Sequence, residues 1–245
     1  MSTKCHIDIE TFGTVDLKKT GSYKYSEHAD TDLLVCCYGF NDGPINLWIP
    51  EGIDSMALPF EVYEALYDLQ AADPNIGEIT IKDVCPLDLG EHIANGHTCA
   101  AWNAEFERVL LNGRISKLYA VPPSNIRQWE CIAAKAAVHA LPRALGNACN
   151  VMDTVHKKVE DGRQHMLALS RPRNKSGVAR WTPADSPNRF MALYKYCVND
   201  VLAERAMDDA LPDLQPSEQE IYFLDQEINQ RGIQLDTHRA IAVRV

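Results

Sequence analysis

Two acidic residues separated by one position stand near the start of the chain, in Cys5-His6-Ile7-Asp8-Ile9-Glu10-Thr11. The alternation of apolar and polar residues predicts a β-strand with Asp8 and Glu10 on one face. Residues two apart on a strand are about 7 Å apart. The two carboxylates can therefore hold one divalent cation between them, and they would repel each other if buried together without one. An exposed edge strand is the alternative interpretation of this segment alone.

Two later segments place further polar side chains beside short elements. Asn103-Ala104-Glu105-Phe106-Glu107 follows the small, apolar segment 98–102, which predicts a strand followed by the first turn of a helix. Tyr196 and Asp200 are four residues apart on a predicted helix and therefore share one side of it. Asp200 borders the apolar stripe of that helix, where an unpaired charge is costly. A structural hydrogen bond is the alternative explanation of this pair.

The elements that must position these residues alternate between strands and helices. Strands are predicted at 5–11, 33–40, 45–49 and 98–102, and helices at 60–69, 104–111, 129–145 (divided by Pro142) and 187–211. The polar segment 17–32 is predicted to be a loop or a short helical excursion. This order indicates an α/β sandwich with a mixed central sheet flanked by helices.

Composition limits the class of protein. Of 245 residues, 46% are hydrophobic and 24% charged, as in ordinary globular proteins. We expect a cytosolic protein that contacts no membrane, because no apolar run can cross a bilayer and no signal peptide fits before the first strand. The eight scattered cysteines are expected to be reduced core residues. A net charge of −10 argues against non-specific coating of nucleic acid, but not against an enzyme whose metal ions lie between its carboxylates and a phosphate.

One part of this acidic chain is basic. Residues 162–184, called the basic segment below, contain no acidic side chain and five positive ones: Arg163, Arg171, Arg173, Lys175 and Arg180. Arg171 and Arg173 are candidate contacts to a phosphate backbone. A solvated flexible loop is the alternative interpretation.

The segments around Asp8, Glu107 and Tyr196 resemble, in order and approximate spacing, the three motifs of the DEDD 3′–5′ exonucleases. The third segment, Tyr196-Cys197-Val198-Asn199-Asp200, is similar to the Tyr-x-x-x-Asp motif of the tyrosine subgroup. The resemblance covers residues 1–211 and implies a ribonuclease-H-like exonuclease fold.

The resemblance also implies a site for two divalent cations, Mg²⁺ or Mn²⁺. Asp8 would bridge both cations, while Glu10 and Asp200 would complete the one on the side of the nucleophile. Glu107 would support the other cation, and Tyr196 would orient the attacking water.

The second motif departs from the family pattern. The family normally has aspartate where this chain has Glu107, so the supporting side chain is one methylene longer. Glu105 lies two residues earlier, and the first turn of the helix is expected to point it elsewhere.

The implied reaction is hydrolysis of single-stranded DNA from its 3′ end to 5′-mononucleotides. Asn103 is a candidate contact to the terminal nucleotide, and Thr11 is a further candidate substrate-binding residue. Phe12 is a candidate stacking residue whose alternative is the core. Two other functions stay open: a 3′–5′ exonuclease that acts on RNA, and a catalytically silent exonuclease fold that serves as a scaffold for a polymerase.

The C-terminal part has a different character. Residues 211–216 predict a linker, Ser217-Glu218-Gln219-Glu220 predicts a capping box for a helix that ends at Gly232, and Asp236-Thr237 predicts the start of another helix. Residues 217–236 resemble the segment where bacteriophage-type family A DNA polymerases pass from the proofreading domain to the polymerase domain.

This second resemblance implies a domain division. Residues 1–212 would form the exonuclease domain, and 213–245 a linker and the truncated start of a polymerase-type region. The expected partners are a single-stranded DNA 3′ end and a polymerase domain, in cis or as a separate chain. A phage-encoded protein would work in the bacterial host cytoplasm.

Overall fold

The computed structural model of this chain describes residues 3–51, 58–156, 160–173 and 180–236. It divides into two compact units, Met1–Asp213 and Leu214–Val245. The predicted boundary at residue 212 lies beside this division. The division separates two compact parts of the chain and does not assign a function to either.

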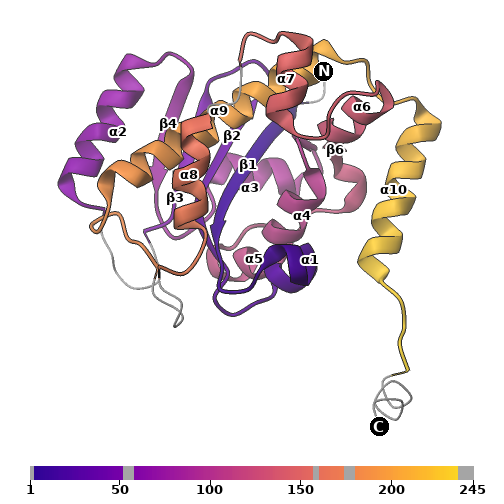
Figure 1. The fold of residues 1–245 in the computed structure, drawn as a ribbon, viewed down its shortest axis with the longest axis horizontal. Helices are drawn as coiled ribbons and strands as arrows, with labels where there is room; N and C mark the ends of the chain where they lie inside the picture. The colour runs from indigo at the N-terminus through magenta and orange to yellow at the C-terminus, as the bar shows by residue number, and fades with distance from the viewer. Residues whose placement is uncertain (1–2, 52–57, 157–159, 174–179, 237–245) are drawn as a thin grey trace. The chain divides into compact units, whose positions relative to one another are not determined.

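One six-stranded sheet forms the centre of the first unit, in the order β4-β3-β2-β1-β5-β6. Its strands are β1 (Lys4–Phe12), β2 (Asp32–Phe40), β3 (Ile45–Ile49), β4 (Ile76–Ile81), β5 (Thr98–Ala101) and β6 (Trp129–Cys131). β1 and β3 pair with β2 in antiparallel fashion, and the other three pairs are parallel. The predicted mixed sheet is therefore confirmed, with the acidic strand β1 inside it rather than at an edge (Figure 1).

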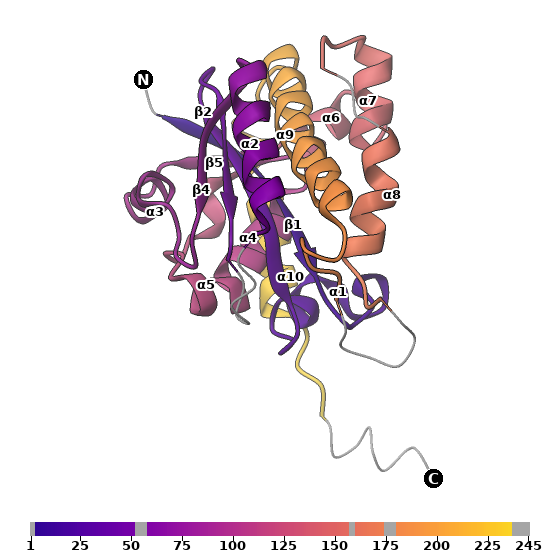
Figure 2. The same ribbon diagram turned by 90° about the vertical axis from the view of Figure 1, so that its left-hand side faces the viewer.

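Helices cover both faces of this sheet. They are α1 (Leu17–Ser26), α2 (Phe60–Ala72), α3 (Leu87–Ala94), α4 (Ala104–Asn112), α5 (Arg114–Tyr119), α6 (Ile132–Val138), α7 (Leu145–Met152), α8 (Glu160–Leu169) and α9 (Pro187–Ala210), with a short 3₁₀ turn at Ile126–Gln128. Figure 2 shows α2, α8 and α9 on one face and α3 and α5 on the other. The site described below lies under α9.

Helix α9 covers the strands because its apolar residues recur at helical spacing. Phe190, Leu193, Cys197 and Val201 pack with Leu47 and other residues of β2 and β3 in one buried cluster. The helix starts at Pro187 as predicted, where the missing N–H and fixed φ of proline are suited. Ser186 occupies the N-cap position, but its side chain makes no capping hydrogen bond among the described residues. The sequence thus determines both the start of α9 and the side that it buries.

One local prediction was wrong, one alternative interpretation does not hold for part of its segment, and two elements were not predicted. Residues 129–131, predicted as helix, form edge strand β6, which pairs Trp129 with Cys99 of β5. Residues 160–169, which overlap the basic segment, form helix α8 rather than a loop. Neither β4 nor α3 was predicted.

The second unit contains helix α10 (Pro216–Arg231). It begins one residue before the predicted capping box, with Gln215 as N-cap and no side-chain capping bond among the described residues, because Pro216 provides the first helical position. It ends at Gly232, which has φ 66°, as predicted. Asp236 is not helical, and residues 237–245, where the next helix was predicted, lie outside the described residues.

Two predictions from composition can also be compared with the structure. All eight cysteines are free and buried, which confirms them as reduced core residues. Within the described part of the chain, no helix is long and apolar enough to cross a membrane.

Candidate metal centre

Three carboxylates from two distant segments converge beneath α9. Asp8 and Glu10 on β1 and Asp200 on α9 each offer an oxygen, and these three oxygens lie within 4.8 Å of one another. The Sγ atom of Cys197 donates to the carbonyl oxygen of Asp8 over 3.5 Å, which fixes α9 against β1 at this point. Such a group of acidic oxygens is suited to a hard divalent cation.

Glu107 in the first turn of α4 joins the site at a greater distance. Its side chain is buried and lines the same cleft as Asp8 and Asp200, but it is not one of the three carboxylates that converge within 4.8 Å. Burial, followed by the negative charge of Asp8, raises the pKa of Glu107 well above its ordinary value. Among the described residues, its Oε2 atom has no hydrogen-bond partner.

The neighbouring acidic residue of α4 is occupied elsewhere. Glu105 accepts a hydrogen bond of 3.3 Å from the Ser22 hydroxyl on α1. The first helical turn therefore separates Glu105 from Glu107 as predicted, and only Glu107 lines the cleft.

Two adjoining cavities form this cleft, and both are lined by Asp8, Glu107, Tyr196 and Asp200. The first extends toward the end of β1 and the start of α1, and its further lining includes Glu10, Thr11, Tyr25, Phe106 and Arg171. The second extends toward α7, and its further lining includes Trp102, Asn103, Arg143, Arg163 and Glu204. The carboxylates therefore lie where the two cavities meet.

Tyr196 is held in the cleft by helix α8, which lies beside α9 (Figure 2). Its side chain is buried, although it lines both cavities. A Cβ atom at Gly162 of α8 would lie 2.3 Å from Cδ2 of Tyr196. Glycine at position 162 is thus what permits α8 to cover the tyrosine so closely.

The predicted substrate contacts fall into two groups. Thr11 and Arg171 line the first cavity and Asn103 lines the second. Thr11 is itself buried, and its hydroxyl lies 3.2 Å from the hydroxyl of Tyr25. Phe12, however, is only 2% exposed and packs in the core. Its proposed role in stacking is wrong because a base has no free ring face to contact.

The positive residues of the basic segment also differ in whether they line the cleft. Arg173 does not line the two described cavities; its guanidinium stacks 4.0 Å from the ring centre of Trp181 and pairs with Asp185 at 3.3 Å. Arg180 pairs with Asp32. Lys175 lies outside the described residues. Of the two arginines predicted to bind phosphate, Arg171 is therefore the one that faces the acidic site.

The chain is homologous to part of a phage protein. No family model matches it. It is similar to the DNA polymerase of Bacillus phage SP02, with 30% identity over 236 residues, which is 94% of this chain and 31% of that protein. The chain spans about a third of the length of the relative it matches. This homology agrees with the predicted resemblance to a bacteriophage-type DNA polymerase.

Sequence reasoning missed one buried acidic residue of the cleft. Glu204 lies one turn after Asp200 on α9, is 1% exposed and lines the second cavity. Burial, then the charges of Asp8 and Glu107, raise its pKa well above the ordinary value. The only signal in the sequence was its four-residue spacing from Asp200, which is common on surface helices.

A second acidic group, near the end of α9, is neutralised by the protein itself. Glu130, Asp208 and Asp213 offer oxygens within 4.8 Å of one another. Asp208 pairs with Lys4 at 2.9 Å, with His6 at 3.0 Å and with Lys135. Although burial acts to raise the pKa of Asp208, hydrogen bonds from these partners hold it below its ordinary value. This group is an ion-pair network.

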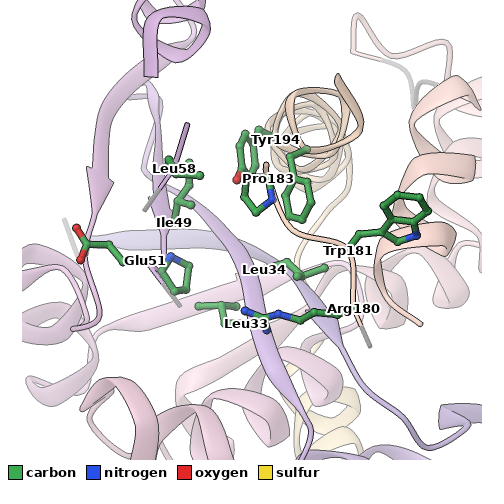
Figure 3. Close-up of a pocket in the computed structure, with 11 residues that line it drawn as sticks. Leu33, Leu34, Ile49, Glu51, Leu58, Arg180, Trp181, Pro183 and Tyr194 are labelled. Atoms are coloured by element: carbon green, nitrogen blue, oxygen red, sulfur yellow. The ribbon is translucent and has the colours of Figure 1, made fainter. Parts of the chain in front are cut away.

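A third cavity, shown in Figure 3, lies near the end of the basic segment. The side chains of Leu33, Leu34 and Ile49 line it together with Tyr194 and Arg180. Arg180 is already paired with Asp32, which also accepts a hydrogen bond from Tyr119. The cavity is therefore lined mainly by apolar side chains, together with this ion pair and Glu51 (Figure 3).

Proposed function

We propose that residues 1–212 form a ribonuclease-H-like 3′–5′ exonuclease domain that hydrolyses single-stranded DNA 3′ ends to 5′-mononucleotides. The observation that carries this proposal is the convergence of Asp8, Glu10 and Asp200 in a cleft that Glu107 and Tyr196 also line. Homology to a phage DNA polymerase supports DNA rather than RNA as the substrate, and proofreading for a family A polymerase as the role. Residues 213–245 are then a linker and the start of a polymerase-type region.

The residues present fit two divalent cations. All donors are hard carboxylate oxygens, as Mg²⁺ and Mn²⁺ prefer. Asp8, Glu10 and Asp200 would hold one cation, and Asp8 and Glu107 the other. Asp200 is only 5% exposed among other carboxylates, an arrangement that is repulsive without a counter-charge. Bound cations would lower the pKa of a water molecule and stabilise the departing 3′ oxygen.

The chain's own residues position the substrate. The Tyr196 hydroxyl can donate and accept hydrogen bonds, so it is suited to orient the attacking water. Arg171 at the first cavity supplies a positive charge for the backbone phosphates next to the 3′ end of the strand. Asn103, at the second cavity, is placed to contact the terminal nucleotide. A single strand is the natural substrate because its terminal phosphate must enter the cleft.

The proposal is tested with a 5′-labelled single-stranded DNA oligonucleotide, incubated with the purified chain in Mg²⁺, in Mn²⁺ and in chelator. We expect a ladder of shortened products only with a cation, and slower degradation of an RNA oligonucleotide of the same sequence. Faster degradation of RNA would favour the RNA-directed alternative. Absence of products with either cation would favour the silent scaffold.

A further inference from the structure

We propose that Glu204 is a further metal-binding residue, which binds the second divalent cation together with Asp8 and Glu107. The inference rests on the proposed function and extends it, because it adds a fifth carboxylate to the four proposed metal ligands Asp8, Glu10, Glu107 and Asp200. Its test measures cation binding directly and can therefore fail independently of the nuclease assay.

The surroundings of Glu204 do not explain it as a structural residue. Its Oε2 atom accepts a hydrogen bond of 2.7 Å from the backbone N–H of Trp102, at the end of β5. Its Oε1 atom is buried and, within the described ranges, has no hydrogen-bond partner. A buried polar atom normally has a partner. One oxygen of Glu204 therefore anchors the backbone, while the other remains for a ligand.

Asp208 provides a comparison within the same helix. It lies one turn further along α9 and is about as buried as Glu204, at 6% and 1% exposure. Lys4, Lys135 and His6 surround Asp208. No such ion pair is formed by Glu204 in the part of the chain that the structure describes, and the next cation on the helix, Arg205, donates to the carbonyl oxygen of Gly43 instead.

The positions of the carboxylates also favour this assignment. Glu10 lines only the first cavity, Glu204 lines only the second, and Asp8, Glu107 and Asp200 line both. The acidic side chains thus extend along the cleft from one cavity into the other. A cation held by Asp8, Glu10 and Asp200 would have three carboxylates. Without Glu204, the second cation would have only Asp8 and Glu107.

The test is calorimetric titration of MnCl₂ into the metal-free protein. We expect two Mn²⁺ sites in the wild type. Glu204→Gln keeps an oxygen for the Trp102 N–H but removes the charge, and we expect it to retain one site and to weaken the other at least tenfold. The matched control is Asp209→Asn, which changes an exposed acid on the same helix and should leave both sites unchanged.

Thermal unfolding distinguishes loss of the cation from loss of the fold. Metal-free Glu204→Gln should melt at or above the wild-type temperature, because it removes a buried negative charge from a group of like charges. Its stabilisation by saturating Mn²⁺ should be smaller than that of the wild type. If Glu204→Gln does not fold, Glu204→Asp replaces it, with a weaker second site as the expected result.

Unchanged affinity at both Mn²⁺ sites in either variant would overturn the assignment of Glu204. If the second site is lost in the variant while the wild type degrades no DNA, the assignment stands and the nuclease function fails. If the wild type degrades DNA and the variant binds Mn²⁺ normally, the nuclease function stands and the assignment of Glu204 fails.

Discussion

The close packing of α8 on α9 makes Gly162→Ala the most informative substitution. The new methyl group would lie 2.3 Å from Cδ2 and 2.7 Å from Cβ and Cγ of Tyr196. Carbon atoms in contact are normally about 3.5–4.0 Å apart, so α8 or the tyrosine must move by more than about 1 Å. Overpacking of this kind costs about 1–3 kcal/mol of stability.

Activity should fall further than stability. A displacement of about 1 Å in a group that positions a reactant lowers turnover by up to about 100-fold. We expect kcat on single-stranded DNA to decrease by about 10- to 100-fold, while KM and Mn²⁺ affinity change little because the carboxylates lie on β1, α4 and α9. The assay is steady-state release of 5′-mononucleotides, with circular dichroism to monitor folding.

The control for this substitution is Gly90→Ala in α3. The nearest atom to a Cβ at Gly90 is Sγ of Cys85, at 3.7 Å, which is ordinary contact. This variant should keep full activity and gain about 0.4–1 kcal/mol of stability. Tyr196→Phe in the Gly162→Ala background provides a further test, because the two effects should not add if glycine acts through the tyrosine hydroxyl. Wild-type kcat in a folded Gly162→Ala variant would refute the positioning role of α8.

Three further predictions concern the carboxylates and the DNA contact. Asp8→Ala should abolish Mg²⁺-dependent hydrolysis without changing the circular dichroism spectrum; a wild-type rate would remove Asp8 from the site. Glu107→Asp should preserve or raise activity at saturating Mg²⁺, and a large loss would contradict its role as a metal-supporting residue. Arg171→Glu should weaken single-stranded DNA binding in a salt-dependent manner. Arg173→Glu should weaken single-stranded DNA binding less than Arg171→Glu, because the guanidinium of Arg173 contacts Trp181 and Asp185. Equal losses of affinity in the two variants would show that a position at the cleft does not determine which arginine contacts DNA.

The fold was predictable where local signals agree. Helix α9 has proline at its first position, an apolar stripe along its length and Pro212 after its end, so the sequence determines it without knowledge of the tertiary structure. Strand β6 has only three residues, and its conformation depends on pairing with β5, which is about 30 residues distant in the chain. Such an element cannot be recognised from its own sequence.

The site was predictable where motifs specify spacing, but not where burial decides a residue's role. The spacing identified Asp8, Glu10 and Asp200, which the structure brings together. The pairing register of β1 slips between Glu10 and Thr11, so the alternation at the start of the strand does not continue to Phe12. Glu204 was missed because four-residue spacing on a helix says nothing about whether a carboxylate is covered by other elements.

Helix α9 carries two buried carboxylates with different surroundings, and one of them belongs to the candidate metal centre. Asp200 and Asp208 are about 12 Å apart along the helix axis, and both are buried. The protein supplies Lys4, Lys135 and His6 to Asp208, whereas Asp200 faces Asp8 and Glu10. Buried carboxylates need counter-charge in both places. At Asp208 the chain provides it, and at Asp200 the converging carboxylates of Asp8 and Glu10 form a group that could share a divalent cation.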